Sequence, residues 1–300
     1  MAAPVLGIVS PGAMGSGLGR AWTLGGLRVV ATTAGRSART AALAQGLELL
    51  VDLDAVVDSA DIVLSVCPPA LARAVAGEIA AAARRTSRRP LVCDLNAIAP
   101  ATMAEVATIL AAAGLESVDG SISGGPPTGR PGQVTRLYLS GPAAARIATL
   151  EAPGLALIVV SDRLGDASAV KMCTASVYKG FSGLLAQALA TAAAHGVTRL
   201  VVADLHASFG QRLDGLPTQI AVAASKSDRF PGEMREIART QAEAGWVGDL
   251  FEAMATVYEQ VHATKLGRHT PEEAAAIGDL DRVLVELRTA SRDGSEAAPP

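Results

Sequence analysis

The stretch VLGIVSPGAMGSGLG, residues 5–19, decides the fold of this chain. Its apolar start, residues 5–9, predicts a buried β-strand, and the glycine-rich residues that follow predict a tight turn into a helix. The turn nearly matches the pattern G-x-G-x-x-G, with Ser10, Gly12 and Gly15 in the three glycine places. In a strand–turn–helix unit this pattern lets the backbone approach a pyrophosphate at the N-terminus of the helix. We therefore expect cofactor contacts from Ser10, Gly12, Ala13, Met14 and Gly15.

Composition and charge exclude several classes of protein. The 300 residues suffice for two domains with sizeable cores, and the net charge of −3 with scattered basic residues gives no nucleic-acid footprint. No apolar run is long enough to span a membrane, and the N-terminus lacks the basic segment of a signal peptide. The three cysteines show no metal-ligand spacing and are typical of a reducing compartment. We expect a cytoplasmic protein without a nucleic-acid, membrane or metal partner.

Strand and helix signals alternate through the first half of the chain. The expected strands are residues 5–9, 27–31, 62–66, 91–94, 137–140 and 155–160. Alanine-rich helical segments, such as residues 71–85 and 101–113, separate them. This alternation favours an α/β domain with a mostly parallel sheet and helices on both faces. We expect a Rossmann-type, doubly wound domain over residues 1–163.

The strand signals stop after about residue 162, and helical patterns fill the rest of the chain. One long helix is expected over residues 166–195, with Gly196 just beyond it as a stop signal. Further helices are expected at residues 198–209, 232–244, 248–262 and 271–290. We expect an all-α C-terminal domain over residues 164–290, followed by a polar, disordered tail at residues 291–300.

Four segments, in order, resemble motifs of the β-hydroxyacid dehydrogenase superfamily. They are GIVSPGAMG (7–15), DLNAIAP (94–100), DGSISGG (119–125) and GDASAVKM (165–172). They resemble, in turn, the family's glycine motif, its D-x-S-T-x-x-P segment, its substrate loop and the start of its interdomain helix. The superfamily includes 3-hydroxyisobutyrate and 6-phosphogluconate dehydrogenases and is related to the imine reductases. The helical half is similar mainly in character, and RFPGEMREI (229–237) resembles a branch with a phosphogluconate-dehydrogenase-like C-terminal domain.

The resemblance implies that Lys171 is the general acid/base. Hydride transfer between a nicotinamide and a carbinol needs a group that takes the hydroxyl proton or returns it. The chain departs from the family pattern at Ala175, where the family has asparagine, and at Tyr178, where 6-phosphogluconate dehydrogenases have an acidic glutamate. Tyr178 lies two helical turns beyond Lys171 on the same face. It is a second catalytic candidate, and a packed amphipathic side chain is the alternative.

The resemblance also implies residues for the substrate and the cofactor. Asn96 stands where the family has a serine that helps bind a substrate carboxylate, and its amide could also contact the nicotinamide amide. Ser123, Gly124 and Gly125 offer a hydroxyl and backbone N–H groups suited to a carboxylate. A further pair follows a predicted strand, where we expect backbone contacts to the cofactor: Cys67 and Pro68.

The end of the second expected strand indicates which cofactor the chain prefers. NAD sites usually carry an acidic residue there, about 20 residues after the glycines, to bind the ribose 2′-hydroxyl. Residues 31–40 contain no carboxylate, and instead offer Arg36, Ser37 and Arg39. Arginine has a planar fork of donors that matches a phosphate. We therefore expect NADP, with Arg36 as the main partner of its 2′-phosphate.

These features predict an NADP-dependent oxidoreductase that acts on a small polar, carboxylate-bearing hydroxy or keto substrate, with Lys171 as general acid/base. Two alternatives stay open. Ala175 permits the less polar pocket of an imine reductase on the same fold. Ser10 and the missing asparagine at position 175 favour a catalytically silent NADPH-binding sensor or scaffold. The apolar surface of the helical half, together with the resemblance, predicts a homodimer.

Overall fold

The computed structural model describes residues 3–128 and 132–288, so the expected tail at residues 291–300 lies outside the described residues. The chain divides into two compact units, residues 1–173 and 174–300. The division falls inside one long helix, α7 (Asp166–Ala194). The expected domain boundary at residues 163 and 164 lies ten residues earlier, just before α7 begins. About two turns of α7 therefore belong to the N-terminal unit.

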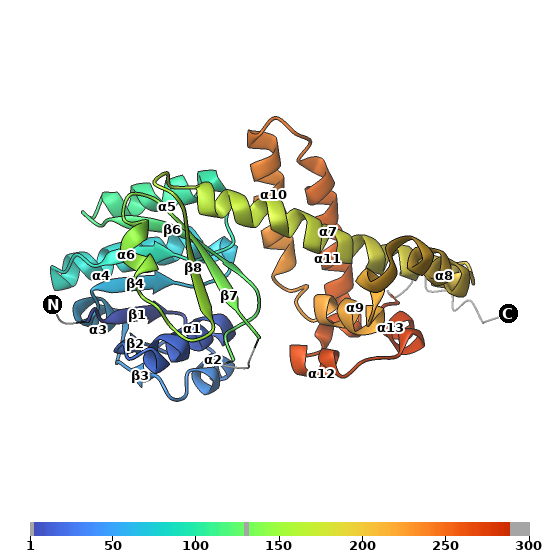
Figure 1. The fold of residues 1–300 in the computed structure, drawn as a ribbon, viewed down its shortest axis with the longest axis horizontal. Coiled ribbons are helices and arrows are strands. Elements are labelled where there is room, and N and C mark those ends of the chain that lie inside the picture. Colours follow the sequence, from blue (N-terminus) through green and yellow to red (C-terminus); the bar gives the residue numbers. More distant parts are fainter. Residues whose placement is uncertain (1–2, 129–131, 289–300) are drawn as a thin grey trace. The chain divides into compact units, whose positions relative to one another are not determined.

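An eight-stranded sheet forms the centre of the N-terminal unit, with the strand order β3-β2-β1-β4-β5-β6-β7-β8 (Figure 1). Strands β1 to β6 are parallel, β7 is antiparallel to β6, and β8 is parallel to β7. The order reverses between β1 and β4, which makes this pair the switch point where sheets of this type bind ligands. The strands are β1 (Leu6–Val9), β2 (Val29–Ala31), β3 (Glu48–Leu49), β4 (Ile62–Ser65), β5 (Leu91–Asp94), β6 (Ser117–Ser123), β7 (Thr135–Ser140) and β8 (Leu155–Ser161).

Helices cover both faces of this sheet, which confirms the doubly wound fold. Alternate strand residues point to opposite faces of the sheet. Ile8 packs with Leu18 and Trp22 of α1 (Ala13–Leu24) in one core, and Val9 joins the other core with Ile79 of α4 (Ala72–Thr86). The helices of this unit are α1 (Ala13–Leu24), α2 (Ala38–Leu43), α3 (Leu53–Ser59), the short 3₁₀ helix η1 (Pro69–Leu71), α4 (Ala72–Thr86), α5 (Pro100–Ala111) and α6 (Ala144–Ala148).

All six expected strands are present within two residues at each end, but two further strands were not expected. Strand β6 corrects the interpretation of residues 119–125 as a loop, because Asp119 to Ser123 are strand and the turn begins only at Gly124. Aspartate and glycine have low β-propensity, so the local pattern hides this strand. Pairing with β5 on one side and β7 on the other forms it. Strand β3 has only two residues, too few to give a pattern.

The second unit is helical, and one core cluster includes Leu189, Ile220, Leu266 and Val283. The expected helix over residues 271–290 is divided, because α12 (Pro271–Ala275) ends before Gly278 and Asp279 caps the start of α13 (Leu280–Glu286). Helix α9 was not expected. Among the described residues, none of the helices is apolar over a length that would cross a membrane. After α7 come α8 (Thr198–Phe209), η2 (Gly210–Leu213), α9 (Leu216–Ala224), α10 (Phe230–Glu243), α11 (Asp249–Ala263), η3 (Leu266–Arg268), α12 (Pro271–Ala275) and α13 (Leu280–Glu286).

Candidate cofactor and catalytic site

Most of the residues predicted for the site follow the carboxyl ends of parallel strands. Ser10 follows β1, Arg36 comes five residues after β2, Cys67 follows β4, Asn96 follows β5 and Ser123 ends β6. The strands are parallel neighbours, so these ends meet at one edge of the sheet. That edge is where doubly wound sheets bind nucleotides and substrates.

The glycine turn has the geometry that its sequence predicts. Ser10 has a φ of 65°, in the left-handed region, which explains why glycine is usual in this first place. A Cβ added at Gly15 would lie 2.9 Å from the Ser10 carbonyl oxygen and 3.2 Å from Ile8 Cγ2, so α1 packs closely on β1. At Gly12, the residue before α1, an added Cβ would meet no described atom within 4 Å, and no side chain caps the helix. The N-terminus of α1, which begins with Ala13 and Met14, is thus open to an anion.

Two buried side-chain atoms near this turn lack a hydrogen-bond partner among the described residues. They are the hydroxyl oxygen of Ser10 and the Nε of Arg36. A buried donor without a partner is costly, so both atoms fit a ligand that brings oxygen acceptors. Ser37 caps the short helix α2 by accepting from the Thr40 amide at 3.2 Å, and Arg39 is exposed on that helix. The residues present therefore fit the phosphate groups of a dinucleotide.

Asn96 is buried and ties the ends of β4 and β5 together. Its Nδ2 donates to Asp94 Oδ2 at 2.8 Å and to Ser65 Oγ at 3.0 Å, and its Oδ1 accepts from the Cys67 amide at 2.6 Å. Both amide hydrogens are thus engaged inside the protein, and a substrate carboxylate would compete with Asp94 and Ser65 for them. The observed geometry makes Asn96 a bridge that fixes the backbone after β4, and its contact with substrate stays a prediction.

Two ionisable groups in this network have strongly shifted pKa values. Burial raises the pKa of Asp94 to about 7, and the negative charge of Asp119 adds to the rise while hydrogen bonds from Asn96 oppose it. Burial, followed by the charge of Asp94, raises the pKa of the Cys67 thiol to about 12. Cys67 therefore stays a thiol at neutral pH. The contact of its backbone and of the exposed Pro68 with a cofactor stays a prediction.

Lys171 lies in the second turn of α7, and its Nζ donates to the Ile122 carbonyl at 2.8 Å. It is the only lysine in residues 1–173. The carbonyl that it contacts directly precedes Ser123, Gly124 and Gly125, so the structure brings these predicted residues together. Ser123 Oγ accepts from Arg136 at 3.4 Å, and Gly124 has a φ of 113°, which only glycine adopts readily.

The loop after β6 also reaches the glycine helix. A Cβ added at Gly17 of α1 would lie 3.0 Å from Pro126 Cβ and 3.0 Å from Pro127 Cδ. Thr135 of β7 donates to the Gly125 carbonyl at 2.7 Å and fixes the start of the loop. The helix that follows the glycine turn and the Ser-Gly-Gly turn of residues 123–125 are therefore neighbours within the N-terminal unit.

Tyr178 lies in the second unit, seven residues after Lys171 on the same helix. Its side chain is 68% exposed, so it is not packed inside its own unit, whereas Ala175 is buried. A role of Tyr178 in proton transfer stays a prediction.

Sequence reasoning did not single out two buried aspartates beside the candidate site. Asp94 holds Asn96, and Asp119 accepts hydrogen bonds from the start of α7. Both side chains are at most 1% exposed. Acidic residues are almost never fully buried unless they have partners, and these two have them. Asp94 could have been found from the sequence, because it is an acidic residue at the end of an expected buried strand. Asp119 could not be found in this way, because strand β6 was not expected.

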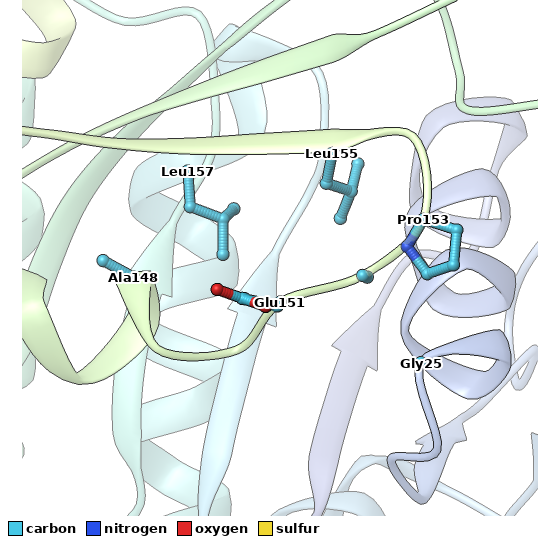
Figure 2. Close-up of a pocket in the computed structure, with 7 residues that line it drawn as sticks. Gly25, Ala148, Glu151, Pro153, Leu155 and Leu157 are labelled. Carbon is cyan, nitrogen blue, oxygen red and sulfur yellow. The ribbon is translucent and has the colours of Figure 1, made fainter. Parts of the chain in front are cut away.

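A surface hollow of about 600 Å³ lies elsewhere in the N-terminal unit, between the end of α1 and the start of β8 (Figure 2). It lies beyond the C-terminal end of α1, whereas the glycine turn precedes the N-terminal end. None of the predicted site residues lines it, so it is separate from the candidate site. Its lining residues are Gly25, Ala148, Glu151, Ala152, Pro153, Leu155 and Leu157.

Comparisons with known proteins match the range that holds the first three motifs and a part of the helical half. Residues 5–150 match the family described as the NAD binding domain of 6-phosphogluconate dehydrogenase, and residues 192–261 match a domain of unknown function, DUF1932. A sequence comparison with curated proteins gave no match.

Three solved structures illustrate the likeness in fold. A conserved protein of unknown function, described as structurally similar to 3-hydroxyacid dehydrogenases, shares 25% identity with a TM-score of 0.62, over 86% of this chain and 96% of that chain. A 3-hydroxyisobutyrate dehydrogenase from Salmonella typhimurium shares 21% identity with a TM-score of 0.67, over 90% and 98% of the two chains. An imine reductase from Myxococcus stipitatus shares 21% identity with a TM-score of 0.53, over 94% and 100%. With its NAD-binding domain of the 6-phosphogluconate dehydrogenase type and the helical domain that follows, the chain belongs to the β-hydroxyacid dehydrogenase superfamily.

Proposed function

We propose that this protein is an NADP-dependent oxidoreductase that moves a hydride to or from a small polar substrate, a hydroxy acid or the corresponding keto acid. As a member of the superfamily, the chain is an NAD(P)-dependent oxidoreductase that acts on CH–OH groups. The proposal of a hydroxy or keto acid substrate rests on the position of Lys171, whose Nζ donates to the Ile122 carbonyl directly before the Ser-Gly-Gly turn.

The protein's residues divide the chemistry between them. When bound, the nicotinamide cofactor supplies or accepts the hydride. Lys171 moves the proton: its ammonium donates to the substrate oxygen during reduction, and its amine takes the hydroxyl proton during oxidation. Next to it, the Ser123 hydroxyl and the N–H groups of Gly124 and Gly125 bind the substrate carboxylate. Ser123 Oγ accepts from Arg136, so its own hydrogen can donate to that carboxylate.

The preference for NADP rests on the residues that follow β2. Arg36 has a buried Nε without a partner among the described residues, and no carboxylate lies between residues 31 and 40. Ser37 and Arg39 stand beside it at the start of α2. This turn carries two arginines and no acidic side chain, so it suits the 2′-phosphate of NADP. It lacks the carboxylate that accepts a hydrogen bond from the ribose 2′-hydroxyl in an NAD site.

The proposal is tested by NADPH oxidation with a panel of keto acids, aldehydes and cyclic imines. We expect a keto acid to be turned over, and Lys171→Ala to slow the reaction by about 100-fold or more while NADPH affinity is kept. Lys265→Ala is the matched control, because the Lys265 side chain is exposed in the helical unit. Imine turnover that survives Lys171→Ala would contradict the proposal and favour an imine reductase, with Tyr178 as the next proton donor. Tight NADPH binding without any turnover would favour a sensor or scaffold.

The proposal extends to a homodimer in the cytoplasm. Val177, Leu184 and Leu200 are each more than half exposed on α7 and α8, and burial of such side chains against a second copy would stabilise it. Cys67 and Cys93 are free thiols, which suits a reducing compartment. Light scattering at micromolar concentration measures the assembly, and a monomeric mass would contradict the dimer.

A further inference from the structure

A carboxylate from strand β6 caps the start of helix α7. Asp119 Oδ2 accepts from the amides of Gly165 at 3.0 Å and Ser168 at 2.9 Å, and Asp119 Oδ1 accepts from Ser168 Oγ at 2.6 Å. The first N–H groups of a helix have no partner within the helix itself. The carboxylate also lies at the end of the helix where the dipole favours negative charge. Asp119, which lies 46 positions before Gly165 in the chain, therefore fixes the first turn of α7.

Two serines complete this attachment. Ser140 of β7 donates to Asp119 Oδ2 at 2.9 Å and accepts from the Ala167 amide at 2.9 Å. Ser121 of β6 donates to the Ala167 carbonyl at 2.7 Å. Asp119, Ser121 and Ser140 are at most 1% exposed, so water does not compete for these bonds. Burial raises the pKa of Asp119, and the hydrogen bonds from Ser168 oppose the rise.

The same strand and helix meet a second time at the candidate catalytic lysine. Asp119 contacts α7 at its first turn, and the Ile122 carbonyl accepts from Lys171 Nζ at 2.8 Å. Three strand residues span about 10 Å, and the six residues from Gly165 to Lys171 span about 9 Å of helix. The two segments therefore run side by side over matching lengths and are joined at both ends. A shift or rotation of the helix at the first junction displaces Lys171 at the second.

We propose that Asp119 is a positioning residue for Lys171. It fixes the height and rotation of α7, so that Nζ meets the Ile122 carbonyl beside the Ser-Gly-Gly turn. The inference rests on the proposed function of Lys171 and adds the group that holds it in place. Asp119 itself is not assigned any contact with the substrate or cofactor.

The test reads the position of Lys171 without a substrate. Time-resolved acylation by an N-hydroxysuccinimide ester, followed by peptide mass spectrometry, gives separate rates for Lys171 and for the exposed Lys265, which is the internal reference. Asp119→Asn keeps the shape and one oxygen acceptor but removes the charge that strengthens the capping bonds. We expect Lys171 to be labelled about tenfold faster in this variant, because its contact with Ile122 loosens, while the rate at Lys265 stays unchanged.

Ser121→Ala is the matched control. It removes a hydrogen bond between the same strand and the same helical turn but keeps every hydrogen bond to the Asp119 carboxylate, so we expect the rate at Lys171 to change less than about twofold. A wild-type rate at Lys171 in Asp119→Asn, or an equal rise at Lys265, overturns the inference. Where Asp119→Asn does not fold, Ser168→Ala is the second variant. It removes the Oγ–H that donates to the Asp119 carboxylate, a charge-assisted hydrogen bond that Ser121→Ala keeps. We expect the rate at Lys171 to rise about threefold in this variant, and an unchanged rate overturns the inference.

Turnover measurements separate this inference from the proposed function. With a substrate in hand, we expect Asp119→Asn to lower kcat about tenfold, to alter the pH profile of kcat and to leave the Kd for NADPH unchanged. Turnover that persists in Lys171→Ala contradicts the proposed function, even when Asp119→Asn accelerates labelling of Lys171. Turnover that needs Lys171 but keeps its wild-type kcat and pH profile in Asp119→Asn overturns the positioning role alone.

Discussion

Replacement of Arg36 by alanine is expected to weaken NADPH binding selectively. The Nε of Arg36 is buried and has no hydrogen-bond partner among the described residues, so its donor is available to a ligand at the end of β2. Hydrogen bonds between charged groups contribute about 1.5–3 kcal/mol. At 25 °C this corresponds to a rise of roughly 10- to 150-fold in the Kd for NADPH. NADH lacks the 2′-phosphate, so its Kd should change less than about twofold.

Fluorescence titration with NADPH and NADH measures both constants on the same protein. Arg36→Lys keeps the charge but loses the planar fork, so we expect an intermediate Kd for NADPH. Arg28→Ala is the matched control. Arg28 directly precedes the N-terminal end of β2, whereas Arg36 follows its C-terminal end, and Arg28 pairs with the exposed Glu48. It should leave both constants unchanged.

Two results would refute the reasoning about Arg36. Equal weakening of NADPH and NADH in Arg36→Ala would mean that the side chain supports the fold of the turn and does not read the 2′-phosphate. Wild-type protein that binds NADH as tightly as NADPH would show that the acid-free end of β2 does not select the cofactor.

Three further outcomes follow from contacts in the structure. Gly15→Ala should lower the free energy of unfolding by about 1–3 kcal/mol and weaken NADPH binding, because its Cβ would lie 2.9 Å from a backbone carbonyl; denaturant titration that shows no loss would contradict this. Several contacts lower the pKa of Glu286 to about 2, and the hydrogen bond with His269 is the largest of them. Glu286→Gln should therefore lower the free energy of unfolding by roughly 1.5–3 kcal/mol at pH 7. The ionised Glu286 stabilises the fold above its unfolded pKa of about 4.3, so the difference from wild type should shrink as the pH falls from about 4 toward 2, and a constant difference would argue against it. Iodoacetamide at pH 8 should modify the exposed Cys173 well before Cys67, whose pKa of about 12 leaves little thiolate, and the reverse order in mass spectra would disprove the burial argument.

The sequence predicted those elements whose residues carry a strong local pattern. Apolar runs bounded by glycine or proline marked six strands, and unbroken helical periodicity marked α7 to within one residue of its end at Ala194. The glycine turn was predictable in detail, because the tight packing at Gly15 and the left-handed conformation at Ser10 are requirements of the local backbone. Strand β6 was missed because long-range pairing with β5 and β7, and not its own residues, makes it a strand.

The sequence by itself determined which chemical groups this protein offers: a glycine turn after β1, an end of β2 without acidic residues that is followed by Arg36, and Lys171 near the start of a long helix. Only the tertiary structure decided how these groups are held. It places both amide hydrogens of Asn96 on Asp94 and Ser65, and it attaches the first turn of α7 to Asp119. The physical reason is that hydrogen-bond partners and burial depend on contacts between residues far apart in the chain. Motif spacing states which side chains are present, and the packed sheet sets which donors remain for a ligand.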